Sequence, residues 1–473
     1  MIQKLKNDHW PIFLLSSLSS FGNLFLPIIL VRFLTPEDVG IYKIFFLHLS
    51  AIPFLFMAGG PVNSVFYWTG KEEREQKTYL NATWSLSLMI AGVILGVGFL
   101  LKDFVSQNLD LPHQYVSILI MTGAFYSPSG HFSESSIALK KNIGPLLDTI
   151  FELMKAAGFI FIAWKFKSLS YIFIFFSSYI LLRVLICTYL NKRINDIGLR
   201  TTKFHLQKVW LYCTPIAFSG LLSFFVDKVD MLLLSTHLSA SSFAFYSMGC
   251  LVVPPLYLLE MSVQKVLIPD LSKSYTEKNS EAGAEAFRKA IKNISFLIIP
   301  SFFGLFVFAK PIIRFLYTDQ YLDSVIFLQI FAFSYLLLLF PHDSAARATG
   351  QTGWILKMYL IITPLLLVAA YLSAIYLGAI GVLTITLVIK FIPKFLGLRF
   401  SKQTMGWQWR DMFPLKHLIL FVTICIVLSL FCKLCESYFK NDIHWFLVCG
   451  STFGILYLAS SNLIGTRGRY AHV

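Results

Sequence analysis

The chemistry open to this chain lies in a few charged side chains that interrupt long apolar runs. Asp148, Glu152 and Lys155 are spaced i, i+4 and i+7, so a helix places all three on one face. Asp227 and Asp230 are three residues apart and also share a face. An acid inside such a run is costly to bury and is by default a functional candidate. These four acids are therefore predicted either to couple a proton or another cation or to pair with neighbouring cations.

His131 and Glu134 form a second candidate group, in a polar segment of another apolar run. A histidine beside a carboxyl group can exchange a proton near neutral pH. The alternative, which we favour, is a hydrogen-bonded contact between helices. Glu260 and Asp343 are further single acids in apolar surroundings.

Four basic residues are candidates for binding an anion. Arg32 and Lys43 flank the short polar break VRFLTPEDVGIY, and Lys310 and Arg314 lie one helical turn apart. Arginine and lysine bind phosphate strongly where water is excluded. Phosphate contact is therefore predicted for these residues. The alternative places them at the edge of the apolar layer, where a long basic side chain reaches water or pairs with nearby acids.

Asn23 belongs to a polar stripe near the start of the chain, in which Ser16 and Ser20, and Ser19 and Asn23, are four residues apart. Such a stripe either lines a cavity that binds a polar ligand or lets two helices pack closely through small residues. The sequence supports both interpretations equally.

No catalytic pattern accompanies these residues. The chain has no phosphate-binding glycine loop, no H-E-x-x-H and no G-x-S-x-G. Cys432 and Cys435 form a C-x-x-C in an apolar stretch without a second pair, so neither a metal site nor a cofactor is expected. We therefore predict no enzyme and no catalytic residue; a proton or other cation gradient is the one candidate energy source.

The elements that must position these residues are membrane helices. Of 473 residues, 56% are hydrophobic and only 14% are charged, whereas soluble domains have about 25% charged residues. About fourteen apolar runs are long enough to span a bilayer, which takes roughly 20 residues each. They lie near residues 10–33, 40–66, 79–101, 114–138, 143–164, 168–190, 210–235, 241–267, 291–316, 323–345, 352–376, 379–398, 416–435 and 443–465. The sequence predicts an all-α, polytopic membrane protein.

The loops between these runs set the orientation. With the N-terminus inside, the inner loops and termini hold 23 lysines and arginines, and the outer loops hold four. Basic residues are retained on the cytoplasmic side of membranes. Both termini are therefore predicted to be cytoplasmic. The net charge of +15 follows from these loops, so no nucleic-acid partner is expected.

An internal repeat divides the chain. With a shift of 204 residues, the first and seventh runs share eight identities over 32 positions, including Pro11 with Pro215 and Tyr42 with Tyr246. Because six helices separate the two segments, both halves have the same orientation, as in transporters built from parallel repeats. We predict two pseudo-symmetric six-helix lobes, 1–200 and 201–405, followed by two more helices and a cytoplasmic tail, 406–473.

The break VRFLTPEDVGIY is predicted to be the outer turn between the first two helices, with Pro36 ending one and Gly40 opening the next. It resembles the signature that follows the first helix of bacterial polysaccharide flippases of the O-antigen and exopolysaccharide type. These belong to the multidrug/oligosaccharidyl-lipid/polysaccharide exporter superfamily. The segments AKPIIRFLYTDQYLDS and SAARATGQTGW in the second half are also similar to that family.

The resemblance implies a flippase in the bacterial inner membrane. It would move an undecaprenyl-type, lipid-diphosphate-linked oligosaccharide to the outer leaflet by alternating access. Its implied partners are that glycan substrate and membrane lipids, with a polysaccharide polymerase and assembly proteins as further candidates.

Three rival functions stay open at this point. One is a cation-coupled multidrug exporter of the same superfamily, although two extra helices and the lack of an acid between Trp10 and Arg32 argue against it. Another is a membrane glycosyltransferase or polymerase, for which the outer loops are too short. The third is a peptidoglycan-precursor flippase, which ranks lower because the first run has no internal arginine.

Overall fold

The structure is a computed structural model that describes residues 25–69, 73–109, 111–139, 141 and 143–467. These residues are overwhelmingly helical, and they contain no strand. Their contacts divide the chain into two compact units, Met1–Ala244 and Phe245–Val473. The first prediction, an all-α fold, is confirmed.

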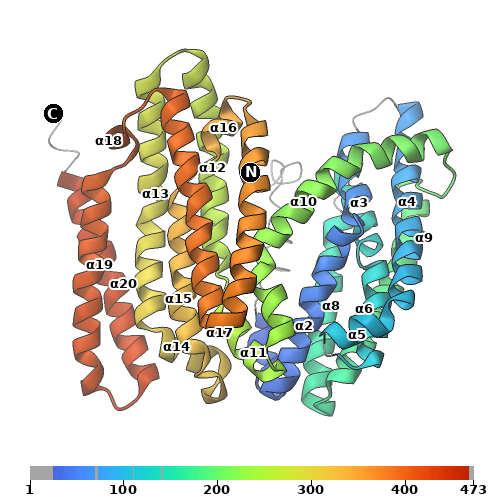
Figure 1. Cartoon of the computed structure of the whole chain (residues 1–473), viewed down its shortest axis with the longest axis horizontal. Helices are drawn as coiled ribbons and strands as arrows, with labels where there is room; N and C mark the ends of the chain where they lie inside the picture. Colours follow the sequence, from blue (N-terminus) through green and yellow to red (C-terminus); the bar gives the residue numbers. More distant parts are fainter. Residues whose placement is uncertain (1–24, 70–72, 110, 140, 142, 468–473) are drawn as a thin grey trace. The chain divides into compact units, whose positions relative to one another are not determined.

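The first unit is built from helices α2 to α10, all of which except α7 are labelled in Figure 1. Their bounds are α2 Pro36–Leu55, α3 Gly59–Trp68, α4 Glu73–Leu100, α5 Lys102–Leu109, α6 His113–Tyr126, α7 His131–Ala138, α8 Ile143–Phe166, α9 Leu169–Ile194 and α10 Lys203–His237. Helix α10 packs against α2, α3 and α4. A core of buried aromatic residues joins these helices, with Trp68 stacked on Tyr79 at 4.1 Å between ring centroids.

The second unit begins within α11 (Ala240–Gly249), which crosses the boundary between the units. The remaining bounds are α12 Pro254–Thr276, α13 Ser280–Val307, α14 Ala309–Tyr317, α15 Ser324–Leu336, α16 Ser344–Ala348, α17 Thr352–Met405, α18 Trp409–Met412, α19 Leu415–Cys435 and α20 Asp442–Arg467. Helix α13 is central, because α12, α15 and α19 all pack against it.

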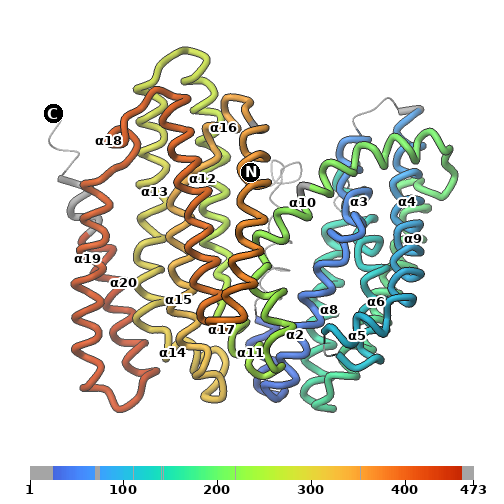
Figure 2. The backbone as a smooth tube through the Cα atoms, in the orientation of Figure 1, coloured from blue at the N-terminus to red at the C-terminus, as the bar shows by residue number. Residues whose placement is uncertain are grey.

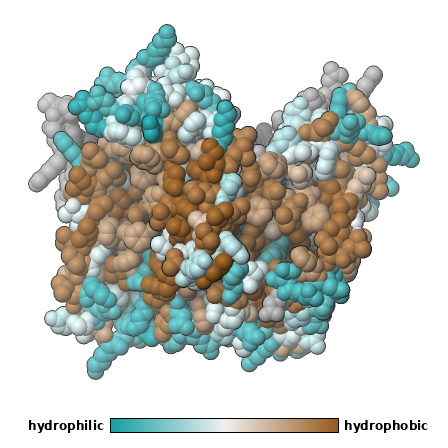
Figure 3. Space-filling model, viewed as in Figure 1, coloured by the Kyte–Doolittle hydropathy of each residue, from teal (hydrophilic) through white to brown (hydrophobic). Residues whose placement is uncertain are grey.

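Membrane exposure follows from the distribution of apolar side chains. On the visible face of each unit, apolar residues cover the middle of the helices and hydrophilic residues gather at their ends (Figure 3). Among the described residues, nine helices are long and apolar enough to cross a membrane, or ten if the bent pair α11 and α12 forms one span. The chain is therefore a multi-pass membrane protein, and the count of about fourteen spans stays a prediction.

Two predicted spans are interrupted. The span at 40–66 is divided into α2 and α3 just before Gly59, Gly60 and Pro61, and Met57 takes a positive φ of 56° there. The span at 114–138 is divided at Ser127 into α6 and α7.

Helix α17 joins two predicted spans (352–376 and 379–398), because only Gly378 leaves helical geometry between them, with φ 64° and ψ −160°. The backbone trace turns back on itself there (Figure 2). This conformation is accessible almost only to glycine.

The turn at VRFLTPEDVGIY differs from the prediction in one respect. Pro36 begins α2 rather than ending the helix before it, because its fixed φ suits the first turn of a helix and its missing N–H is not needed there. Thr35 caps the helix by accepting a hydrogen bond from the backbone N–H of Asp38 at 3.2 Å. Gly40 lies inside α2, where a Cβ atom would overlap the carbonyl oxygen of Ala240.

Candidate functional site

The first unit holds a buried group of charges on α8 and α9, the first charge cluster: Asp148, Glu152, Lys155 and Arg183. The helical spacing predicted for the first three residues is observed, and Glu152 forms an ion pair with Lys155. Arg183 of α9 joins them from the neighbouring helix. Its two terminal nitrogens lie 2.5 Å from an Asp148 oxygen and 3.4 Å from a Glu152 oxygen.

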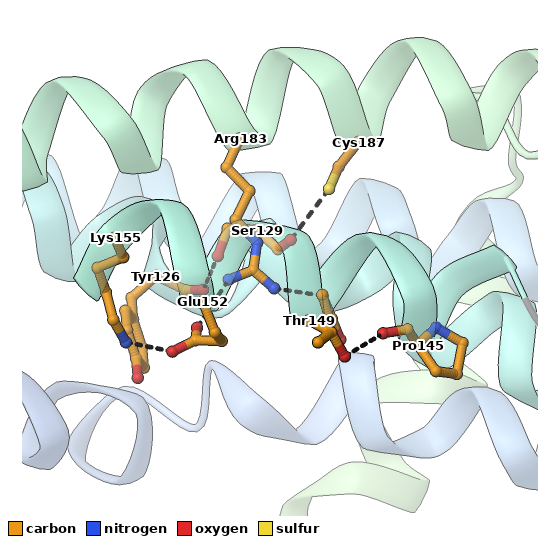
Figure 4. A network of polar contacts seen from close by, with 9 residues as sticks. Tyr126, Ser129, Pro145, Thr149, Glu152, Lys155, Arg183 and Cys187 are labelled. Atoms are coloured by element: carbon orange, nitrogen blue, oxygen red, sulfur yellow. Dashed lines mark hydrogen bonds and ion pairs between the residues drawn. The ribbon is translucent and has the colours of Figure 1, made fainter. Parts of the chain in front are cut away.

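The geometry suits a guanidinium because its planar fork reaches two carboxylates at once. Figure 4 shows Arg183 pointing from α9 toward α8, with the Glu152–Lys155 pair and Tyr126 on the same side. The Arg183 side chain is only 10% exposed and lies over the Phe151 ring at 5.2 Å from the centroid. Its charge is therefore compensated by two carboxylates and an aromatic face rather than by water.

The cluster lies deep within the span. Arg183 is eleven residues before the end of α9 at Ile194, or about 16 Å along the helix. Glu152 is nine residues after the start of α8 at Ile143, or about 14 Å. Both distances are about half the thickness of a hydrocarbon layer of about 30 Å.

Close helix packing holds the cluster in place. A Cβ atom at Gly144 would lie 2.8 Å from the Ser133 carbonyl oxygen, so α8 contacts α7 directly at its first turn. The Cys187 thiol donates to the Ser129 carbonyl at 3.0 Å and ties α9 to the segment before α7.

His131 belongs to a separate polar network in the same unit. It is fully buried, and its ring nitrogens lie 3.0 Å from the Thr83 hydroxyl, 3.1 Å from the Ser135 hydroxyl and 3.2 Å from the Asn191 amide. This is the hydrogen-bonded contact between helices that the sequence favours. Glu134 instead lies within electrostatic reach of Asp148.

The second unit holds a corresponding group, the second charge cluster: Glu260, Asp343, Arg347 and Lys394. Glu260 of α12 and Lys394 of α17 are both 15% exposed and lie 3.9 Å apart. Asp343, just before α16, pairs with Arg347 at 2.7 Å. Lys394 is eleven residues before the end of α17 at Met405, the same depth that Arg183 has in α9.

The second charge cluster is more loosely paired than the first, because Lys394 lies 3.9 Å from Glu260 whereas Arg183 lies 2.5 Å from Asp148. His342 Nδ1, Asp343 Oδ1 and Ser344 Oγ are buried, and the described residues give them no hydrogen-bond partner. A Cβ atom at Gly397 would lie 2.4 Å from the His342 carbonyl oxygen, so α17 passes directly against this turn. Lys394 is one helical turn away from Gly397, which explains why it faces these groups.

Lys310 and Arg314, the predicted phosphate ligands of the second half, have carboxylate partners. Their nitrogens lie 2.9 Å and 2.6 Å from the same oxygen of Asp442, at the start of α20. Arg314 also pairs with Asp319. These contacts tie α14 to α20, and phosphate binding by the two residues stays a prediction.

The remaining predicted residues are not gathered into either cluster. Arg32 is exposed in the turn before α2 and donates to the Ile28 carbonyl, and Lys43 is half-buried on α2. On α10, Asp230 is buried and Asp227 is exposed. Asn23 lies outside the described residues.

Sequence reasoning missed Arg183 and Lys394, although each is a charge within a predicted or nearly continuous apolar run. The same signal, a charge inside an apolar run, selects the acidic candidates. The sequence does not show which acid pairs with each cation, because the partners are far apart along the chain. Arg183 lies 31 residues from Glu152, and Lys394 lies much farther from Glu260.

These arrangements suit ion pairing, proton binding and charge rearrangement inside a membrane rather than covalent catalysis. Among the described residues, no group of three or more histidine, cysteine, aspartate or glutamate side chains is placed to hold a metal ion.

Solved structures with this fold are flippases and transporters. A lipid II flippase MurJ in an inward closed conformation matches with a TM-score of 0.70 and 20% identity, covering 96% of this chain and 98% of that one. An inward-facing multidrug resistance MATE family transporter matches with a TM-score of 0.61 and 14% identity, covering 82% and 94%. A MOP superfamily transporter from Pyrococcus furiosus matches with a TM-score of 0.54 and 14% identity, covering 84% of this chain and 94% of that one. At these identities the likeness shows a shared fold.

No curated protein matches the sequence. The model of one protein family does match, over residues 29–326, which is more than half of the chain. The predicted resemblance to polysaccharide flippases is thereby confirmed at the level of the family: this chain belongs to the polysaccharide biosynthesis protein family.

Proposed function

We propose that this protein is a flippase that moves a lipid-diphosphate-linked oligosaccharide from the cytoplasmic to the outer leaflet of the bacterial inner membrane. The carrier is of the undecaprenyl type, both termini are cytoplasmic, and the glycan serves cell-surface polysaccharide synthesis. The observation that carries the proposal is the family match over residues 29–326.

The extent of the structural alignments supports a lipid-linked substrate over a drug. The flippase structure aligns with 96% of the chain, whereas the multidrug transporter aligns with 82%. Helices α19 and α20 pack on α13 and α14 and are integral to the second unit. A polysaccharide polymerase and assembly proteins are the partners that such a substrate would require.

The charged groups give this function a physical basis. A diphosphate and hydroxyl-rich sugars must be sheltered from hydrocarbon, and cations in a water-poor site attract phosphate strongly. Arg32, Lys43 and Asn23 are proposed to contact the substrate. The acids Asp148, Glu152, Glu134, Asp227 and Asp230, with His131, are proposed as ion-coupling groups during alternating access.

The test is flipping by the purified protein in vesicles. A fluorescent lipid-diphosphate oligosaccharide is incorporated, and its appearance in the opposite leaflet is followed by accessibility to a membrane-impermeant enzyme. Arg32→Ala and Asp230→Ala should each reduce the rate at least about tenfold, which is roughly 1.4 kcal/mol of barrier. The exposed pairs provide matched controls, Lys433→Ala and Asp103→Ala, which should leave the rate unchanged.

Three other results would contradict the proposal. Undiminished flipping in both Arg32→Ala and Asp230→Ala would show that these two residues have no role in transport. Efflux of a cationic dye without glycan flipping would identify a drug exporter, and transport of lipid II alone would identify a peptidoglycan-precursor flippase.

A further inference from the structure

The first unit contains an apolar pocket of about 450 Å³ that neither charge cluster touches. Its walls are formed by α2, α4, α6 and the short helix α5, with Ala51, Val97, Val105 and Leu119 among the lining residues. Its volume is within the range of pockets that hold small molecules and cofactors, about 300–1,000 Å³.

The pocket is lined by thirteen apolar residues and two polar ones, His48 and Asn108, each of which has a hydrogen bond to its own helix. A ring nitrogen of His48 lies 2.9 Å from the Ile44 carbonyl, and the Asn108 amide donates to the Phe104 carbonyl at 2.8 Å. The lining is otherwise apolar, apart from the backbone of the helices. Its chemistry therefore selects a hydrocarbon.

The floor of the pocket is fixed by two glycine contacts. A Cβ atom at Gly98 would lie 2.6 Å from Ile120, and one at Gly123 would lie 2.3 Å from Ile52. Helix α6 is therefore pressed against both α4 and α2 on that side. Because the helices already touch at these points, they cannot close over the remaining space without a backbone shift.

A pocket of the same volume, about 450 Å³, occurs in the second unit between α12, α13 and α14. In the order of predicted spans, α2 and α12 are the second and eighth, and α4 and α13 are the third and ninth. Helices α5 and α14 are the short segments that follow the latter two. Three walls of the two pockets are thus equivalent in the repeat.

The fourth wall differs. In the second unit it is α20, which contributes Phe446 and Phe453 and which Lys310 and Arg314 hold through Asp442. Helix α20 follows both repeats and has no counterpart among the first six predicted spans. In the first unit the fourth wall is α6, with Leu119 and Ile120, and exposed apolar residues border the pocket, with Leu55 at 53% and Phe104 at 65% exposure. Those residues continue the lipid-facing surface of a membrane protein.

We propose that the pocket of the first unit holds one acyl chain of a membrane phospholipid. The chain occupies the space that α20 lines in the second unit. In a bilayer the advantage of filling it is packing rather than escape from water, because an empty apolar space leaves its lining atoms without contact partners.

The test is photolabelling of the full-length protein in vesicles made with phosphatidylethanolamine that carries a diazirine in one acyl chain. The label should concentrate on α4, α5 and α6 residues that line the pocket. Ala51→Phe and Val105→Phe each fill the pocket from a different helix and should reduce that labelling about tenfold, which is about 1.4 kcal/mol of binding free energy. Ala157→Phe, on an exposed face of α8, is the matched control and should not change it.

Three outcomes would overturn the proposal. One is even labelling around all lipid-exposed helices, and another is unchanged labelling in both filled variants while they remain folded. The third is displacement of the label by an undecaprenyl phosphate at low mole fraction, which would assign the pocket to the carrier lipid. Since the readout is binding, none of these results bears on whether the protein flips a glycan.

Discussion

The two charge clusters solve the same problem with different completeness. In the first, one guanidinium lies between two carboxylates at 2.5 and 3.4 Å, and a lysine pairs with one of them. In the second, Lys394 stays 3.9 Å from Glu260. Both clusters contain a buried polar atom without a hydrogen-bond partner among the described residues, Arg183 Nε in the first and Asp343 Oδ1 in the second. The clusters therefore differ in how closely their charges approach, and closer pairing favours a more fixed arrangement.

The largest expected effect comes from removing the central cation of each cluster. Arg183→Ala leaves Asp148 without a cation and Glu152 with Lys155 alone, which should cost about 3 kcal/mol, the lower end of the range for breaking a buried ion pair. Lys394→Ala should cost about 1–3 kcal/mol, because Gln264 still donates to Glu260 at 2.9 Å. Thermal unfolding of purified protein in detergent measures the difference. Equal losses would contradict the contrast between the clusters.

A neutral replacement separates stability from transport. In Arg183→Met combined with Asp148→Asn, Glu152 keeps Lys155 as its partner and position 148 no longer needs a cation, so most of the lost stability should return. If the first cluster takes part in ion coupling, flipping should stay at least about tenfold below the wild-type rate. Recovery of both properties would leave the cluster a purely structural role.

Exchanging the cation types sharpens the comparison further. Arg183→Lys replaces a fork by a point charge that can hold only one of the two acids well, so about 1–3 kcal/mol should be lost. Lys394→Arg should cost less than about 1 kcal/mol, because the second cluster already contains unpaired acceptors for additional donors. The measurement is again thermal unfolding. A greater loss for Lys394→Arg would show that the second cluster is the more rigid one.

The glycines that bring the helices together should have intermediate effects. Gly397→Ala places a methyl group against a backbone carbonyl at 2.4 Å, and Gly144→Ala does so at 2.8 Å. Both should destabilise by about 1–3 kcal/mol, Gly397→Ala more strongly. Gly92→Ala and Gly454→Ala are matched controls, since nothing lies within 4 Å of the added methyl, and they should be neutral or slightly stabilising.

The smallest effect should come from a surface pair. Lys77 and Asp196 form an ion pair in which both side chains are more than half exposed. Lys77→Ala should therefore change stability by no more than about 1 kcal/mol. This variant provides the baseline against which both buried clusters are measured in the same unfolding assay. A loss as large as that of Lys394→Ala would remove the distinction between surface and buried pairs.

The sequence predicts which residues share a helix face but not which helices meet. Asp148, Glu152 and Lys155 follow from helical periodicity, and their common face is observed. Arg183 does not, because its position opposite them depends on how α9 packs against α8. The same reason explains the second charge cluster, in which Glu260 and Asp343 were recognised as single acids and Lys394 was not.

The turn at VRFLTPEDVGIY shows a related limit. Its polar break was predictable from composition, and the helix boundary was predicted four residues too late. The position of Pro36 at the first turn of α2 depends on the Thr35 cap, which competes with the proline signal for a helix end. The requirement for glycine at position 40 comes from Ala240, which lies two hundred residues away.

Because of the hairpin at Gly378, the number of residues between Gly378 and Lys394 matters as much as the charge of Lys394. Only this residue separates the two helical halves of α17, so no flexible loop absorbs an insertion or deletion there. Adding one residue between Gly378 and Lys394 would rotate all that follows by about 100° around the helix axis. Lys394 would then turn away from Glu260 with its charge intact. The fifteen residues between Gly378 and Lys394 are therefore as necessary for the second charge cluster as the lysine itself.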